Sequence, residues 1–295
     1  MLNILNDLQV RSFEEELHEE DIETEVPINV HESDNSKLFE DLLGEACNQL
    51  YAGCTKYSSL NFLVRLMHIK VLNDWSNKSF DMLLELLKSA FPTDASIPSS
   101  YYEAKKKLRD LGLGYDLIHV CKYDCILYWK ELSNCQQCPI CNEPRYKIND
   151  EKGKKIPHKV LRHFLLIPRL KRLFASRHVA SEMRWNKEKH VVTDDILRHP
   201  ADGEGWKHFD REFPQFASDS RNVRLGLALD GFNPFANMNV SYSMWPVMLI
   251  PYNLPPWKCM KETNFFMSLL IPGPKSPGKE IDIYLQPLVD ELKEL

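Results

Sequence analysis

The sequence predicts an α+β protein in which a helical bundle, a cysteine-rich module and a strand-rich C-terminal part follow one another. Three observations support this prediction. Apolar residues recur at helical spacing from Ser36 to Leu113. Five of the eight cysteines fall between Cys121 and Cys141. Beyond Arg221, three short apolar runs are typical of strands, and a helical pattern follows them.

The helical region is expected to span residues 36–114. It divides into four expected helices, which cover residues 38–47, 60–75, 79–91 and 101–114. Ser79 can cap the third helix, and Ser99 or Ser100 the fourth. Apolar stripes of this kind favour the core of a bundle, and a DNA-contacting helix-turn-helix is the alternative.

The N-terminal segment, residues 1–35, is expected to be a mostly disordered acidic leader. The first 45 residues hold fourteen acidic and two basic side chains. An acidic N-terminus does not resemble a signal peptide, and no apolar run reaches about 18 residues, so no membrane span is expected. The expected compartment is the cytosol or nucleus, where thiols stay reduced and clustered cysteines usually hold metal.

Residues 115–150 form the cysteine module, with the spacing Cys121-x3-Cys125-x12-Cys138-x2-Cys141. Two short-spaced pairs of thiolates can complete a tetrahedral zinc site, and a site closed by four thiolates is expected to be structural. Asn142 follows the second pair where the chain must turn back, and Asn tolerates the left-handed conformation.

Other interpretations of the module stay open at this point. Cys135 is a fifth candidate ligand, an iron–sulfur cluster is a second candidate group, and free buried thiols are a third reading. His119 could replace one cysteine, although a packed core histidine is favoured. The isolated Cys47, Cys54 and Cys259 are expected to be ordinary apolar residues.

Residues 151–220 are expected to hold basic helices, with Pro168 interrupting the first, and a connecting loop. Residues 143–190 contain fourteen basic side chains and five acidic ones. On a helix docked by its apolar residues, the outward cations can contact nucleic-acid phosphates. The alternatives are a solvated basic face and a nuclear import signal. The candidate nucleic-acid contacts are Lys155, Lys159, Arg162, Lys171 and Arg172.

Asp230 ends the first strand-like run and begins the sequence DGFNPF. A carboxylate at the end of a rigid strand is well placed to bind a divalent cation. Two-metal phosphoryl transfer needs several such carboxylates. From the residues alone, Asp230 is equally well explained as a turn former before Gly231.

From about Leu38 to Leu295 the chain resembles the plant CACTA-type (En/Spm-like) DNA transposases. The resemblance rests on consecutive blocks that include CPICNEPRYK, VLRHFLLIPRLKRLF, HPADGEGWKHFD, VRLGLALDGFNPF and SYSMWPVMLIPYNLPPW. It implies an RNase H-like catalytic domain over residues 221–295, with a triad of acids that holds Mg²⁺ or Mn²⁺. The DGFNPF block places the first triad acid on Asp230. The implied partner is transposon-end DNA, the implied location is the nucleus, and self-association is kept open.

The sequence departs from that family after the helix expected at residues 281–295. The second and third acids have no counterpart, and Asp282 and Asp290 are expected to be surface charges on this helix. We therefore expect an incomplete RNase H-like domain of three strands and a helix, from a truncated reading frame and inactive alone. An open sheet edge should make this half aggregation-prone. The alternative function is a zinc-stabilised protein- or DNA-binding module without a role in transposition.

Overall fold

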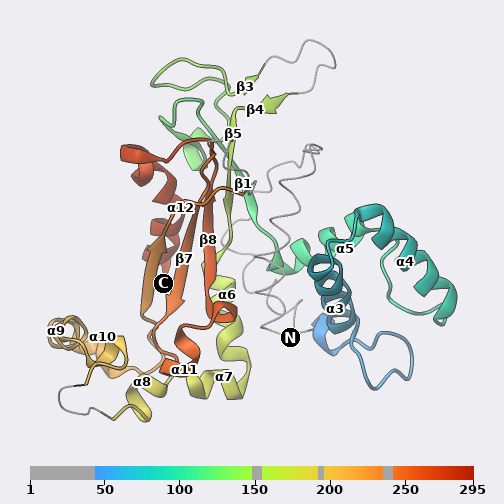
Figure 1. The fold of residues 1–295 in the computed structure, drawn as a ribbon, viewed down its shortest axis with the longest axis horizontal. Coiled ribbons are helices and arrows are strands. Elements are labelled where there is room, and N and C mark those ends of the chain that lie inside the picture. The colour runs from blue at the N-terminus through green and yellow to red at the C-terminus, as the bar shows by residue number, and fades with distance from the viewer. Residues whose placement is uncertain (1–43, 148–154, 192–195, 235–241) are drawn as a thin grey trace.

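The computed structural model describes residues 44–147, 155–191, 196–234 and 242–295. A helical unit stands beside a six-stranded sheet that carries its own helices (Figure 1). The predicted acidic leader lies outside the described residues. Within the described part of the chain, no helix combines the length and apolar character needed to cross a bilayer. The helices are α3 (Ser59–Leu72), α4 (Asn77–Ala90), α5 (Tyr101–Leu108), α6 (Leu166–Ala175), α7 (Arg177–Glu182), α8 (Trp185–Glu188), α9 (Glu204–Glu212), α10 (Pro214–Ser218), α11 (Pro256–Cys259) and α12 (Ile281–Glu294).

The predicted helical bundle is confirmed for α3, α4 and α5, and residues 44–47, at the end of the first expected helix, are helical as well. Their apolar stripes meet in one core whose fully buried members include Leu60, Val64, Phe80 and Leu84. Ser100 caps α5 as expected, because its hydroxyl accepts from the backbone N–H of the third helical residue.

The predicted cap of α4 is wrong by one helical turn. Ser76, and not Ser79, lies in the extended conformation before the helix, and its hydroxyl accepts from the backbone N–H of Ser79 at 3.1 Å. Both serines precede the apolar run, so the sequence pattern does not separate them. The Asn77–Ala90 helix gains its first turn from residues that carry no apolar signal.

The sheet is antiparallel throughout, and its strand order is β2-β1-β5-β8-β7-β6. A separate two-stranded ribbon pairs β3 with β4 at the end of the molecule that carries the cysteines (Figure 1). The strands are β1 (Asp116–Val120), β2 (Leu127–Tyr128), β3 (Tyr146–Lys147), β4 (Ile156–Pro157), β5 (Lys159–His163), β6 (Leu225–Leu229), β7 (Trp245–Pro251) and β8 (Phe266–Ile271).

The three strands predicted after residue 221 are present as β6, β7 and β8, but they do not form a sheet alone. β8 pairs with β5, and β5 pairs with β1, so residues from all three predicted ranges 115–150, 151–220 and 221–295 share one sheet. The expectation of a three-stranded sheet is therefore wrong. The hydrophobic core of the six-stranded sheet also draws on all three ranges, because buried side chains of β1, β5, β7 and β8 form one cluster with α6 and α12.

The first basic residues of the predicted helical range 151–220 form a strand and not a helix. β5 lies between β1 and β8, and Leu161 and His163 are buried while Arg162 is half-buried. The basic residues mask the strand signal, and pairing with two distant strands decides the conformation. Helix α6 begins only at Leu166, and Pro168 lies in its first turn, where a missing N–H costs little. The predicted connecting loop contains α9 and α10.

Helix α12 packs one face against the sheet and α6. Tyr284, Leu288 and Glu291 are buried, whereas Val289 and Leu292 are each more than 40% exposed. The Glu291 carboxylate accepts from the backbone N–H groups of Leu166 and Ile167, at 3.0 and 3.4 Å, and lies 3.0 Å from His163 Nε2. A buried carboxylate therefore joins α12 to the first turn of α6, which periodicity of apolar residues does not predict.

Strand β6 forms one edge of the sheet in the described residues. Its sequence is LGLAL, Leu227 is 55% exposed, and Ala228 is exposed as well. The structure thus has an uncharged edge strand of the kind that pairs readily with other chains. The expectation of poor stability in this half of the molecule remains a prediction.

Candidate metal centre and strand-end carboxylate

Four cysteine thiols converge at the end of the sheet. The sulfurs of Cys121, Cys125, Cys138 and Cys141 all lie within 4.8 Å of one another. Around tetrahedral zinc, sulfurs at 2.3 Å from the metal would be about 3.8 Å apart. Cys121 and Cys138 are almost fully buried, and the other two are half-buried. The donor set and its spacing therefore fit a closed, four-thiolate zinc site.

The first pair of thiols comes from the turn that joins β1 to β2 in an antiparallel hairpin. The Cys121 N–H donates to the Ile126 carbonyl, and the Asp124 N–H donates to the Cys121 carbonyl, both at 3.0 Å. Asp124 has φ of 62°, which folds the chain back between the two cysteines. The hairpin thereby presents both sulfurs on one side.

The second pair lies in a tight turn held by its own backbone. The Cys138 N–H donates to the Glu143 carbonyl at 2.9 Å, and the Asn142 N–H donates to the Cys138 carbonyl at 2.8 Å. Asn142 has φ of 59°, so the left-handed conformation expected at this position is confirmed. An Asn side chain reaches this conformation at lower cost than most residues.

The electrostatics of the four thiols favour a cation among them. Burial raises the pKa of Cys121, and burial together with the neighbouring thiols raises the pKa of Cys125. Burial also opposes ionisation of Cys138, but the backbone N–H groups of Cys141 and Ile140 outweigh it and lower that pKa. Several thiolates this close repel one another, and a bound metal ion reverses that repulsion.

Cys135 and His119 lie outside the group of four. His119 is buried, and its Nδ1 accepts from Arg145 Nε at 2.9 Å, so it is a packed histidine as favoured. Burial and the Arg145 charge lower its pKa to about 4, which keeps the ring neutral. The same arginine donates to the Cys135 carbonyl and stacks over Tyr128 at 4.8 Å. Arg145 therefore holds the segments around the four cysteines together through contacts with β1, β2 and the Cys135 carbonyl.

A second set of contacts ties the first cysteine turn to α12. The Asp124 carboxylate accepts from Lys159 Nζ at 2.7 Å and from the Tyr284 hydroxyl at 2.5 Å. Tyr284 is 1% exposed, and burial followed by the bond to Asp124 raises its pKa well above the usual range. Lys130 and Asp290 add an exposed ion pair at 2.5 Å. No sequence motif marks these pairs, because Asp124 and Tyr284 are 160 residues apart.

The five basic residues predicted to contact nucleic acid lie on different elements and differ in exposure. Lys155 and Lys171 are exposed, but they lie before β4 and on α6. Lys159 is engaged by Asp124, and Arg162 on β5 lies over the Tyr115 ring at 5.9 Å. Arg172 is 6% exposed, and burial lowers its pKa to about 10. The expected row of outward cations on one helix is therefore wrong.

Of the isolated cysteines, Cys54 and Cys259 are buried as expected, and Cys47 is exposed.

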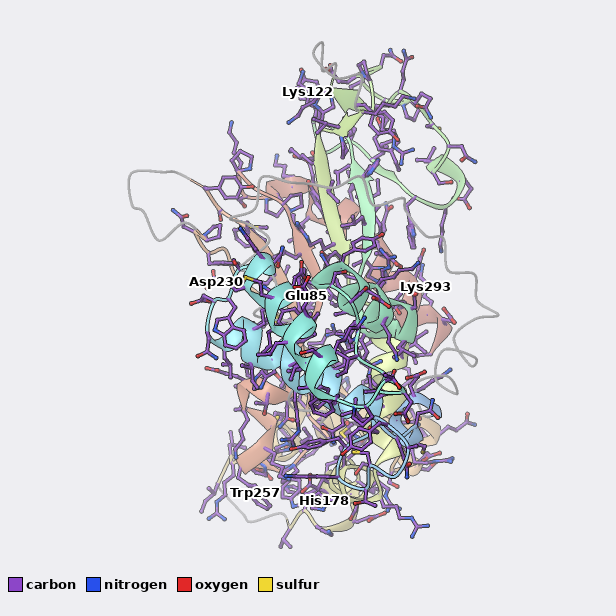
Figure 2. All side chains as sticks on the ribbon, turned by 90° about the vertical axis from the view of Figure 1, so that its right-hand side faces the viewer. Glu85, Lys122, His178, Asp230, Trp257 and Lys293 are labelled. Carbon is purple, nitrogen blue, oxygen red and sulfur yellow. The ribbon has the colours of Figure 1, made fainter. Side chains whose placement is uncertain are left out.

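Asp230 lies at the end of β6, apart from the cysteine group. Figure 2 places Lys122, from the first cysteine turn, near one end of the molecule and Asp230 about halfway down. The carboxylate is exposed and accepts from the Gly231 N–H at 2.8 Å. A Cβ on Gly231 would lie 2.8 Å from the Trp245 ring, so a side chain there would displace its neighbours. Among the described residues, Asp230 belongs to no group of three or more acids, histidines or cysteines that could hold a metal ion. A two-metal centre needs several carboxylates around the ions.

Comparison with known families gives one match. Residues 194–295 match the family model described as "Transposase family tnp2". The matched range contains β6, β7, β8 and α12 together with Asp230, and it leaves out all four cysteines of the metal centre. No curated protein and no solved structure matches the chain. The family match supports the predicted resemblance to transposases, whereas the plant CACTA-type assignment stays a prediction.

Proposed function

We propose that this chain is a transposase-derived protein of a cut-and-paste DNA transposon, that it contacts DNA, and that residues 1–295 alone do not cleave it. The observation that carries the proposal is the match of residues 194–295 to a transposase family, with Asp230 at the end of the first matched strand. The order of three strands and a helix in β6, β7, β8 and α12 supports the further proposal of an RNase H-like domain, as the resemblance to CACTA-type transposases implies.

Zinc at the four cysteines would be structural in this proposal. Four thiolates leave no coordination position for a substrate, so the metal would stabilise the turns that hold it. The first of those turns joins β1 to β2, in the same sheet as β6, and its Asp124 accepts from Tyr284 of α12. A structural metal would thus stabilise the sheet that carries Asp230, and it would take no part in chemistry.

The proposed lack of cleavage follows from the surroundings of Asp230. Hydrolysis and strand transfer by paired Mg²⁺ or Mn²⁺ ions require several carboxylates around the metals. Asp290 is paired with Lys130, and Asp282 is exposed on α12, so both have the surface positions expected of them. We also place the protein in the nucleus, where its DNA substrate would be found.

Two assays on zinc-loaded protein test the proposal. Labelled duplex DNA should shift at about 50 mM salt, because phosphate-driven affinity is strong there. The same DNA should remain uncut with Mg²⁺ or Mn²⁺. Absence of binding would remove the DNA-contact claim. Cleavage that disappears in Asp230→Ala would overturn the inactive reading.

The alternative is a metal-stabilised binding module with no role in transposition. One observation favours it, since the family match stops short of the metal centre. Binding of the chain to a protein partner without any affinity for DNA would select this alternative.

A further inference from the structure

The outer face of the metal module brings exposed lysines together with two tyrosines, of which Tyr123 is exposed and Tyr146 half-buried. Lys122 and Tyr123 lie between the first two cysteines, and Tyr123 is 57% exposed. Tyr146 and Lys147 form β3, and Lys155 immediately precedes its partner strand β4. Lys147 and Lys155 are both exposed. These five residues are called the lysine–tyrosine face below.

Each tyrosine of this face lies beside a lysine. Lys122 Nζ lies 5.2 Å from the centre of the Tyr123 ring, and Lys155 Nζ lies 5.6 Å from the centre of the Tyr146 ring. Lys147 pairs with Ile156 in the ribbon, next to Lys155, so two of the cations share one end of β3 and β4.

The two parts of the face are close enough to share an electrostatic field. His158 follows β4, and its pKa is lowered by burial and then by the charges of Lys122 and Lys147. Glu143 is the counter-charge, since its carboxylate lies 2.8 Å from Lys122 Nζ. The pair is partly exposed, with side-chain exposures of 42% for Lys122 and 26% for Glu143, so a phosphate could replace the carboxylate at small cost.

We propose that the lysine–tyrosine face is a DNA-binding surface, with Lys122, Lys147 and Lys155 on backbone phosphates and the Tyr123 ring stacked on an unpaired base. Lysines supply mobile point charges that suit phosphates, and an exposed aromatic ring suits the face of any base. The alternation of the two residue types favours nucleic acid over an acidic peptide, which would use the cations and leave Tyr123 uncovered. This inference rests on the proposed function and gives its DNA contact a location.

The test compares two triple variants of the zinc-loaded chain with equal changes of charge. One carries Lys122→Glu, Lys147→Glu and Lys155→Glu. The matched control carries the same change at the exposed Lys275, Lys279 and Lys293, near and on α12. Fluorescence anisotropy measures binding to a blunt duplex and to a duplex with a single-stranded tail. Zinc content and the unfolding midpoint are measured for both variants, so that loss of folding is recognised.

The face variant should bind at least about 100-fold more weakly at about 50 mM salt, and its salt dependence should fall by about one unit of log–log slope per lost phosphate contact. The control should change affinity only a few-fold. If wild type binds DNA and both variants bind equally well, the face is wrong while the DNA-contact proposal stands. If wild type binds no DNA, the proposed function fails first. Binding to polyglutamate instead of DNA would point to an acidic protein partner and contradict the proposal.

Tyr123 separates base stacking from simple charge attraction. Tyr123→Ala should weaken binding to the tailed duplex about 10-fold and leave the blunt duplex unchanged, and Tyr123→Phe should bind like wild type. Equal effects of Tyr123→Ala on both DNAs would overturn the stacking assignment.

Discussion

The cysteine end of the sheet and the β6 edge differ in how completely their polar groups are satisfied. Around the cysteines, two local turns bring four donors within 4.8 Å, and Arg145 and Asp124 hold these turns against neighbouring residues. At the β6 edge, Asp230 and Leu227 are exposed, and no further strand pairs with the outer side of β6 in the described residues. The first region has the contacts of a self-sufficient structural site. The second has one acid and an open edge.

The largest effect is expected from loss of the metal. Cys138→Ser, or removal of metal by a chelator, should lower the free energy of unfolding by several kcal/mol, because a structural zinc contributes directly to folding. Denaturant unfolding followed by circular dichroism measures the loss. Cys135→Ser is the matched control, and it should keep both the metal and the unfolding midpoint. An equal loss in Cys135→Ser would show that the ligand set is wrong.

The anchor of α12 should give the next effect. Glu291→Ala leaves the N–H groups of Leu166 and Ile167 without their carboxylate, and a loss of about 3 kcal/mol is expected. Glu294→Ala, on the exposed side of the same helix, should stay within about 0.5 kcal/mol of wild type. If the two variants have the same free energy of unfolding, the Glu291 contact does not stabilise the packing of α12.

A smaller effect is expected from Tyr284→Phe, which removes only the hydroxyl that donates to Asp124. Hydrogen bonds to charged groups contribute about 1.5–3 kcal/mol, so the loss should fall in or just below that range. Tyr102→Phe removes a hydroxyl from a side chain that is 57% exposed, and it should change stability little. Thermal unfolding of the zinc-loaded proteins makes the comparison. Equal unfolding midpoints for the two variants would contradict a stabilising link between the cysteine turn and α12.

The smallest effect on stability is expected at Asp230. Asp230→Ala removes one exposed carboxylate and its bond to the Gly231 N–H, so the free energy of unfolding should change by about 0.5 kcal/mol or less. Zinc content should not change. A loss above about 2 kcal/mol would mean that Asp230 is a structural residue, and the contrast between the two regions would fail.

The sequence predicts well those features that depend on short spacing. The four cysteines and the left-handed Asn142 follow from local turns, and the three C-terminal strands follow from apolar runs bounded by turn residues. The family match then agrees with the resemblance noted for the DGFNPF block.

Features that depend on distant partners could not be predicted in this way. The sequence of β5 contains Lys159 and Arg162 and is predicted to belong to a basic helix. Pairing with β1 and β8 makes it a central strand instead. Glu291 belongs to the polar pattern of α12, yet it is buried because the first turn of α6 supplies donors for it. Neither partner is recognisable before the chain has folded.

Metal content is the most direct measure of the central contrast between four convergent thiols and the exposed carboxylate of Asp230. Elemental analysis of the purified chain should find one zinc per molecule, and Cys138→Ser combined with Cys141→Ser should lose it while Asp230→Ala keeps it. A wild-type chain that holds no metal, or one whose zinc content depends on Asp230 and not on the cysteines, would contradict the account.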